Sequence, residues 1–384
     1  MTEKTHPLLF LQFMMIASIG ARMKVQKVRM TLIVAPKSVL GFWENEAKRF
    51  LPKFAKSVRI EVVHGQTPSD RKKIIRNAWR GASTDRPHVI ISSWGLAGAL
   101  RTLKDFLPPL GKRGGSHWDY VIFDEAHRIK DHKSTRAKCC RKICHKKGTK
   151  RFLLTGTPFQ NDIDELWSIV HLATAGKVLE KNIKHFNKKY GKPTRDARCR
   201  NASRYAERQG EKANEELQEL LKPYVLRRLK KDHLSKELPV KQETCVWVKA
   251  SKQQKMLYKV TVESKMSLAD NILSSDTKLA RSARIHAFRL IQVLMQICNH
   301  PLLHVVDDAD NNNKRKGISK TLEGTELSAI IRGSKKLELS VHMLEAFKEN
   351  GHKVLLFSHS TQNLDIIQYV LLKHGSFTVC RLDG

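Results

Sequence analysis

One short segment carries side chains that are suited to phosphate chemistry. The segment YVIFDEAH places Asp124, Glu125 and His127 directly after an apolar run. Adjacent carboxylates can divide the work of hydrolysing a phosphoanhydride, since Asp124 would help to hold Mg²⁺ and Glu125 would polarise the attacking water. A DE pair alone is weak evidence because a surface turn carries the same residues. For His127 we expect a hydrogen-bonding role between neighbouring segments, with ordinary packing as the alternative.

A second segment, LLTGTPFQN, follows the next apolar run. Thr155 and Thr157 offer hydroxyl groups, Gly156 permits a close approach of the backbone, and Gln160 follows them. Such a segment suits the sensing of a phosphate state, whereas the plain alternative is that the threonines cap the following helix. Together the two segments predict a catalytic group of Asp124, Glu125, His127, Thr155, Gly156 and Thr157, to which the family resemblance described below adds Gln160.

A parallel sheet would bring these segments to one edge. Five short, wholly apolar runs end in small or polar residues, at 30–38, 58–65, 87–95, 119–127 and 150–158. Runs without alternation predict strands that are buried on both faces. Amphipathic stretches at 42–52 and 68–81 have the length of crossover helices. The pattern predicts a doubly wound α/β domain that ends near residue 170, with ligands at the carboxyl ends of its strands.

The composition favours a polyanionic partner. Lys and Arg number 71 against 37 Asp and Glu among 384 residues, which gives a net charge of +34. An anionic membrane is the alternative, but the apolar stretch 8–19 is too short to span a bilayer. A signal peptide is an alternative interpretation of this stretch, but we favour a buried helix. The 7 cysteines are odd in number and irregular in spacing, which indicates an intracellular protein with free thiols.

A basic segment joins the two chemical segments. It contains Arg128, Lys130, Lys133, Arg136, Lys138, Arg141, Lys142, Lys146 and Lys147. These residues would cover every face of a crossover helix, so contact with nucleic acid and simple solvation both stay open. Cys139, Cys140, Cys144 and His145 lie in the same segment, and thiols on a helix are favoured there over a metal site.

The remainder of the chain changes character. Residues 171–245 have a helical pattern, 243–250 resemble a strand, 251–300 are helical and 307–334 are polar and rich in turn residues. The α/β pattern then resumes, and we expect the chain to end inside a second domain. Trp43, Trp94, Trp118, Trp167, Tyr224 and Trp247 are predicted to be packed rather than to stack on bases.

The motifs resemble those of a known family. The segment YVIFDEAH resembles the Walker B motif of helicase-type ATPases, and LTGTP followed by QN is similar to the Swi/Snf-type DNA translocases. DEAH-box RNA helicases usually carry Ser-Ala-Thr at this place. The segments TLIVAPKSVLGFWENEAKRF, VIISSWGL, KPYVLRRLKKDHLSKELPVKQE, QICNHPLL, GHKVLLFSHS and RLDG resemble further motifs of the translocase family. Within the family, these motif sequences resemble most the Cockayne-syndrome-B-like and mitotic translocase branch.

This resemblance implies a domain plan. It predicts a first RecA-like lobe at 1–170, a helical insertion and linker at 171–245, a helical start of the second lobe at 246–334 and a truncated second RecA-like lobe at 335–384. It also implies ATP and Mg²⁺ as cofactors, with Asp124 on the metal. The implied DNA contacts are Pro36, Lys37, Ser38, Ser92, Ser93, Arg227, Arg228, Lys230, Lys231 and Ser358.

One expected element is missing from the sequence. No Gly-Lys-Thr or Gly-Lys-Ser loop is present, although such a loop forms the phosphate cradle of these ATPases. When the family pattern GLGKTLQ is aligned, Leu11 and Gln12 match its end, while Leu9 and Phe10 stand in place of Lys and Thr. The sequence also ends before the arginines with which the family's second lobe contacts nucleotide. His359 departs from the Gln that the family more often has.

Three hypotheses follow. The first is a fragment of a DNA-dependent ATPase whose complete form translocates on double-stranded DNA or remodels nucleosomes or other DNA-bound proteins, with this chain alone inactive. The second is a non-catalytic scaffold that binds DNA or chromatin, and the third is an RNA helicase-like protein. The intact Asp-Glu-Ala-His favours the first. We expect a monomer in the nucleus with no membrane association.

Overall fold

The computed structural model describes residues 7–25, 27–108, 117–156, 163–199, 201–228, 241–264, 277–305 and 321–383. The chain divides into two units, Met1–Pro239 and Val240–Gly384. Unit 1 holds a parallel sheet, and the regular elements of the described part of unit 2 are helices.

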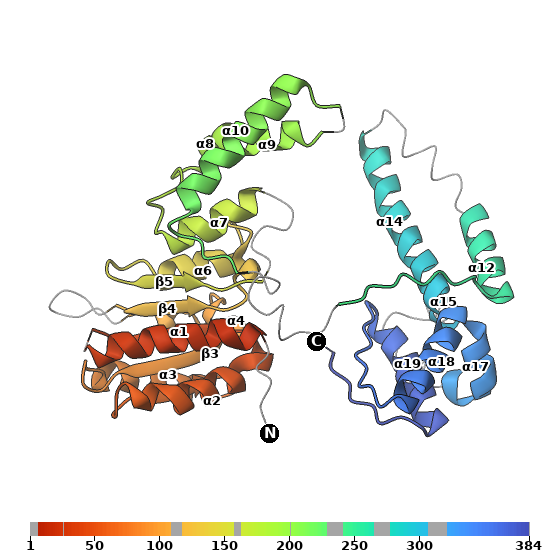
Figure 1. Cartoon of the computed structure of the whole chain (residues 1–384), viewed down its shortest axis with the longest axis horizontal. Helices are drawn as coiled ribbons and strands as arrows, with labels where there is room; N and C mark the ends of the chain where they lie inside the picture. The colour runs from red at the N-terminus through yellow and green to blue at the C-terminus, as the bar shows by residue number, and fades with distance from the viewer. Residues whose placement is uncertain are drawn as a thin grey trace. The chain divides into compact units, whose positions relative to one another are not determined.

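Unit 1 is built on a five-stranded parallel sheet with the order β2-β3-β1-β4-β5. Figure 1 shows β4 and β5 of this sheet side by side. The strands are β1 (Met30–Ala35), β2 (Arg59–Val63), β3 (His88–Ser93), β4 (Tyr120–Phe123) and β5 (Lys150–Leu153). Each strand lies inside one of the five apolar runs, so the prediction of a parallel α/β sheet is confirmed.

Helices cover both faces of this sheet, and the central strands β1, β3 and β4 are buried along their whole length. Along β1, Leu32 packs with α3 (Pro68–Gly81) and α6 (Thr135–Ile143), whereas Ile33 packs with α1 (Pro7–Lys24) and α2 (Leu40–Phe50). The segments after β1 and β4 therefore leave the sheet toward opposite faces. In a doubly wound sheet, such a reversal marks the crevice in which ligands bind.

Helix α1 contains the apolar stretch 8–19, and it is part of the core. Ile16 and Ile19 are fully buried. A Cβ atom on Gly20 would lie only 2.4 Å from Phe54, so the glycine allows close packing. The prediction of a helix packed on the core is confirmed for one face of the described side chains, whereas Phe13 and Met14 are exposed. In the part of the chain that the structure describes, no helix is long and apolar enough to cross a membrane.

Short helices complete the first lobe, and a helical extension follows it. The short elements are η1 (Lys37–Val39), η2 (Leu51–Lys53), α4 (Trp94–Ala97), α5 (Leu103–Phe106) and η3 (Ala126–Ile129). The extension comprises α7 (Ile163–Ala173), α8 (Ile183–Phe186), the π-helix η4 (Asn187–Gly191), α9 (Lys192–Ala197) and α10 (Arg204–Leu221). A separate core, which includes Trp167, Phe186 and Leu217, holds the extension together. The helical pattern predicted from residue 171 is confirmed as far as Leu221.

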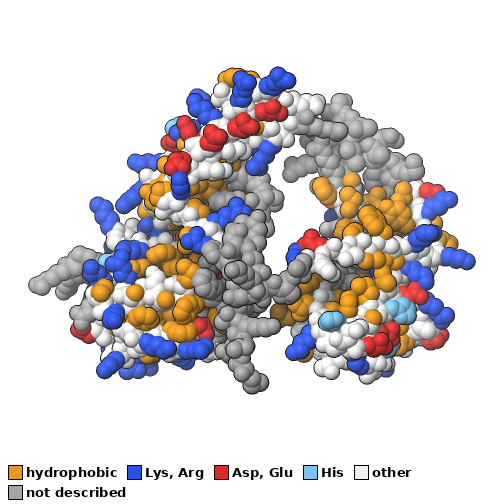
Figure 2. Space-filling model, viewed as in Figure 1, with side chains coloured by type: hydrophobic (Ala, Val, Ile, Leu, Met, Phe, Trp, Pro, Cys, Tyr) orange, Lys and Arg blue, Asp and Glu red, His pale blue; other side chains and the backbone are white. Residues whose placement is uncertain are grey.

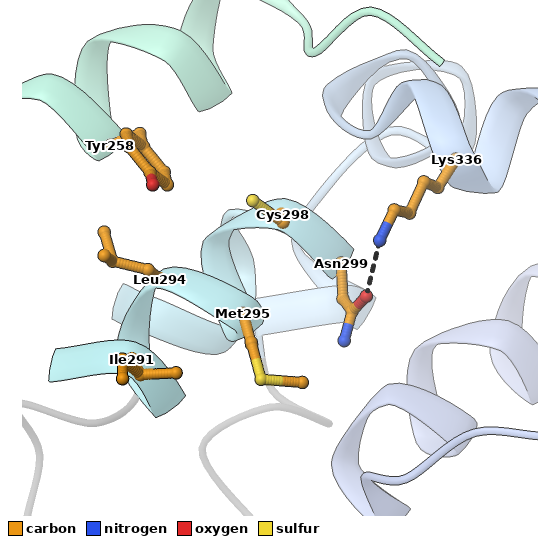
Figure 3. Close-up of a pocket in the computed structure, with 7 residues that line it drawn as sticks. All are labelled: Tyr258, Ile291, Leu294, Met295, Cys298, Asn299 and Lys336. Carbon is orange, nitrogen blue, oxygen red and sulfur yellow. Dashed lines mark hydrogen bonds between the residues drawn. The ribbon is translucent and has the colours of Figure 1, made fainter. Parts of the chain in front are cut away.

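Unit 2 consists of α12 (Lys252–Glu263), α14 (Thr277–Asn299), α15 (Leu302–Val305), α17 (Leu327–Gly333), α18 (Lys335–Glu349) and α19 (Thr361–His374). Its core includes Leu303, Ile330, Leu337 and Ile366. An open groove of about 270 Å³ lies beside α14 and is lined by Tyr258, Ile291, Leu294, Met295, Cys298, Asn299 and Lys336 (Figure 3). Nothing in the structure shows what covers it.

Several local predictions for the second half are wrong. Residues 243–250, 352–357 and 377–383 form no strand, although their patterns suggested one. A strand needs a neighbour to pair its backbone, and the described residues of unit 2 offer none to these segments. Trp247 is 92% exposed and Tyr224 is 58% exposed, so neither is packed as expected.

Candidate functional site

The candidate site lies at the carboxyl edge of the sheet. Ala35 pairs with Ser93, and Phe123 pairs with both Val34 and Leu153, so these strands end at the same edge. The segments after β4 and β5 are bonded directly, because the Ala126 N–H donates to the Leu154 carbonyl at 2.8 Å. The register therefore places Asp124 and Glu125 beside Leu154 and Thr155, as the sequence predicted.

Asp124 is the most constrained of these residues. Its side chain is 5% exposed. The Oδ2 atom accepts hydrogen bonds from Gln12 Nε2 at 3.0 Å and from Trp43 Nε1 at 2.9 Å, while Oδ1 accepts from the Glu125 N–H at 3.0 Å. Its carbonyl oxygen accepts from Trp94 Nε1 at 2.8 Å. Asp124 is therefore held by side chains from α1, α2 and α4.

Glu125 faces outward from this network. It adopts a left-handed backbone with φ of 52°, which is uncommon for a residue with a side chain. Its Oε2 atom lies 3.1 Å from Nδ1 of His127, and the Glu125 side chain is 30% exposed. The carboxylate of Glu125, unlike that of Asp124, is thus open to a water molecule or ligand.

The second chemical segment is described only in part. Thr155 is half-buried and Gly156 is exposed. A Cβ atom on Gly156 would meet nothing within 4 Å, so packing does not require a glycine there. Thr157 and Gln160 lie outside the described residues.

The predicted DNA contacts differ in their exposure. Lys37 and Ser38 are exposed and Pro36 is half-buried, at the end of β1. Ser92 is fully buried and its hydroxyl donates to the Val63 carbonyl at 2.9 Å, so it cannot reach a phosphate in this structure. Ser93 is 4% exposed and its hydroxyl lies 3.2 Å from His64 Nδ1.

The remaining predicted contacts lie further along the chain. Arg227 and Arg228 are exposed, whereas Lys230 and Lys231 lie outside the described residues. Ser358, in unit 2, is half-buried and accepts hydrogen bonds from the Ser360 N–H and from Asn363 Nδ2.

The basic crossover segment forms α6 and its loops, as predicted. Its Lys and Arg side chains are exposed or half-buried, and Figure 2 shows Lys and Arg side chains spread over the visible face of unit 1. The thiols of α6 point inward, since Cys139 and Cys140 are fully buried. Burial raises the pKa of the neighbouring Cys144 to about 12. These thiols are therefore packing groups and not nucleophiles.

Sequence reasoning missed three partners of Asp124. Gln12 was matched only to a family position, and Trp43 and Trp94 were assigned to packing. Both tryptophans are indeed buried, at 0% and 3% exposure. A signal was available, because a buried indole N–H nearly always needs an acceptor. The identity of that acceptor was not readable from local pattern.

Comparisons with known proteins point to one family. The SNF2-related domain matches residues 4–303. The chain is 27% identical to the mouse "DNA excision repair protein ERCC-6-like", over 96% of this chain and 30% of that protein. It is 31% identical to the human "SWI/SNF-related matrix-associated actin-dependent regulator of chromatin subfamily A member 1", over 92% of this chain and 29% of that protein.

A solved structure is also similar. The "Sulfolobus solfataricus SWI2/SNF2 ATPase core in complex with dsDNA" has a TM-score of 0.45 and 24% identity, and the match covers 96% of this chain and 64% of that one. The chain spans about 30% of the length of the curated relatives named above.

Proposed function

The chain belongs to the SNF2-related family, and from this premise we propose that it is part of an ATP-dependent translocase on double-stranded DNA. The observation that carries the proposal is the position of Asp124 and Glu125 directly after β4, beside the segment that follows β5. The relatives carry names from chromatin regulation and DNA repair, which supports nucleosomes or other DNA-bound proteins as targets and the nucleus as the compartment.

Binding of DNA is the role that the surface supports best. The net charge of +34 favours a polyanion, and each phosphate that a Lys or Arg side chain neutralises releases counterions from DNA. Lys37, Ser38, Arg227 and Arg228 are exposed and belong to segments with family resemblance. Ser92 is not included in the proposed contact set because its hydroxyl is buried and bonded.

The fit to a magnesium nucleotide is only partial. In ATPases of this kind the nucleotide supplies the free energy for movement. Glu125 is partly exposed and suits the orientation of a water molecule. The rest of the site does not fit, because Leu9 and Phe10 stand where Lys and Thr would hold phosphate and Mg²⁺. Asp124 Oδ2 is also saturated by two donors of the chain. We therefore expect this chain alone to bind DNA without hydrolysing ATP.

A scaffold without catalysis is the second candidate. The saturated Oδ2 of Asp124 and the apolar residues at positions 9 and 10 favour it. The left-handed, outward-facing Glu125 favours the translocase, because strained backbone is maintained at functional sites more often than elsewhere.

The test is ATP hydrolysis with and without duplex DNA. We would compare this chain with a longer version that carries a Gly-Lys-Thr loop before α1 and nucleotide-contacting arginines after unit 2, each also made with Glu125→Gln. We expect DNA-dependent hydrolysis only in the extended version, with a loss of about 100-fold or more for Glu125→Gln. DNA binding without any turnover in the extended version would favour the scaffold.

A further inference from the structure

Two tryptophans join Asp124 to the segments that follow β1 and β3. Trp43 Nε1 donates to Oδ2 of Asp124 at 2.9 Å, and Trp94 Nε1 donates to its carbonyl oxygen at 2.8 Å. A single residue of the candidate site thus receives one indole donor from α2 and another from α4. No solvent competes for these bonds, because Trp43 is 0% exposed and Trp94 is 3% exposed.

Each tryptophan lies in a helix that begins near the carboxyl edge of the sheet. Trp43 lies in α2, which begins at Leu40 immediately after the turn η1 with the exposed Lys37 and Ser38. Trp94 is the first residue of α4 and directly follows Ser93, the last residue of β3. Trp43 therefore follows the turn that carries two of the proposed DNA contacts, and Trp94 follows β3 at the same edge of the sheet.

Close packing would transmit a displacement of these elements. Trp43 and Leu40 lie in the core cluster that covers one face of the sheet, and Trp94 stacks on Phe123 with ring centroids 5.6 Å apart in the cluster on the other face. Such cores have few voids, so a shift of α2 or α4 moves its indole group with it. Asp124 would respond because its carboxylate and its carbonyl are each held by one of these groups.

A displacement of the Asp124 side chain would also change the position of Glu125. The Glu125 N–H donates to Oδ1 of the same carboxylate whose Oδ2 accepts from Trp43. Rotation of the Asp124 carboxylate therefore changes the hydrogen bond that supports the left-handed backbone of Glu125. Glu125 bears the more exposed carboxylate of the pair.

We propose that Trp43 and Trp94 are positioning residues that couple binding of duplex DNA at the end of β1 to the placement of Asp124 and Glu125. The inference rests on the proposed function, since it takes DNA as the ligand of this edge. It adds a regulatory connection within the first lobe. By linkage, the coupling is reciprocal: whatever displaces Asp124 also changes the affinity for DNA.

The chain offers a matched control. Trp118 is also fully buried, and its indole donates to the Phe106 carbonyl at 2.9 Å, with Trp79 as its ring neighbour at 4.7 Å. Trp118 has the same kind of bond, but its indole donates to Phe106 and not to Asp124. Trp→Phe at each position removes the N–H donor and keeps most of the apolar ring.

The first measurement is a titration of the unaltered chain with a short duplex DNA, followed by the indole N–H signals in a ¹⁵N–¹H spectrum. The variants Trp43→Phe, Trp94→Phe and Trp118→Phe assign the signals, and fluorescence anisotropy measures the DNA affinity independently. We expect the Trp43 and Trp94 signals to shift with the same midpoint as the anisotropy, while the Trp118 signal does not move. This readout separates coupling from a purely structural role.

The second measurement is the DNA affinity of the variants. Coupling between sites typically changes affinity by about fivefold or more, so we expect Trp43→Phe to weaken duplex binding by about that factor and Trp118→Phe to leave it unchanged. If Trp43→Phe fails to fold, the titration of the unaltered chain and Trp94→Phe decide the matter.

Two outcomes would overturn the proposal, and they differ in what else they overturn. If the chain binds DNA while the Trp43 and Trp94 signals stay fixed and the variants bind normally, the coupling is absent but the proposed function stands. If the chain binds no duplex DNA at all, the proposed function fails and the coupling fails with it.

Discussion

At the scale of single residues, His300 shows how the partners of a buried side chain fix its protonation. His300 is 2% exposed. Its Nδ1 atom accepts a hydrogen bond from the Leu302 N–H at 3.1 Å, and its Nε2 atom lies 2.9 Å from the Ile330 carbonyl. Only the neutral ring with its proton on Nε2 satisfies both contacts. Burial lowers the pKa of His300 from 6.5, although the bond to Ile330 opposes this shift.

The stability of unit 2 should therefore fall in mild acid. Above pH 6.5 both the folded and the unfolded states hold His300 neutral. Below it the unfolded state takes up a proton that the folded state resists, so the free energy of unfolding decreases until the pH reaches the lowered pKa of the folded state. Urea unfolding at pH 7.5 and 5.5 measures this change. His300→Gln, which cannot titrate, should show a smaller pH dependence.

The other histidines with a lowered pKa, His88 and His171, are present in both proteins and cancel in this comparison. An identical pH dependence in the variant would show that His300 does not contribute.

At the scale of elements, the helical extension depends on a close approach between α9 and α10. A Cβ atom on Gly210 would lie 2.3 Å from the Cβ of Ala197 and 3.0 Å from the Pro193 carbonyl. Ser203 caps the start of α10 by accepting a hydrogen bond from the Ala206 N–H. Glycine in a helix is normally unfavourable, so at this position the contact outweighs helix propensity.

Gly210→Ala should therefore destabilise the protein even though alanine favours helices. We expect a loss of about 1–3 kcal/mol in the free energy of unfolding, because the added methyl group overpacks the α9–α10 contact. Gly41 in α2 provides the control, since a Cβ atom there would meet nothing within 4 Å. Gly41→Ala should be neutral or stabilise by up to about 1 kcal/mol. Urea unfolding distinguishes the two, and a stabilising Gly210→Ala would refute the packing argument.

At the scale of the whole molecule, the net charge of +34 makes the proposed DNA binding sensitive to salt. Bound counterions are released from DNA for each phosphate that the protein neutralises, so the logarithm of the binding constant should fall linearly with the logarithm of salt concentration. The slope counts the phosphates that are contacted. It therefore tests individual lysines without any requirement for ATP.

Lys37→Ala should reduce this slope by about one phosphate contact and weaken binding to all duplex sequences alike. Lys56→Ala is the control because Lys56 is also exposed but precedes β2, at the amino edge of the parallel sheet. Fluorescence anisotropy between low and moderate salt gives both slopes. Equal slopes for Lys37→Ala and the unaltered chain would remove Lys37 from the contact set.

The sequence by itself determined the first lobe. Apolar runs without alternation can only be stable when both faces are covered, so 30–38 and 119–127 identified β1 and β4 and placed Asp124 at a strand end. The same reasoning failed at 243–250 and 352–357, where strand-like residues lack a pairing partner among the described residues of unit 2. The local sequence pattern indicates which secondary structure a segment can adopt. Whether a strand forms also depends on a neighbouring segment that can pair with its backbone.

Only the tertiary structure decided the environment of the site. Gln12 and Trp43 are separated from Asp124 by 112 and 81 positions, yet both donate to the same carboxylate oxygen. Ser92 was expected to face a phosphate and instead bonds to Val63 inside the sheet. A hydrogen bond depends on distance and direction between side chains, and neither is encoded in the spacing of residues along the chain.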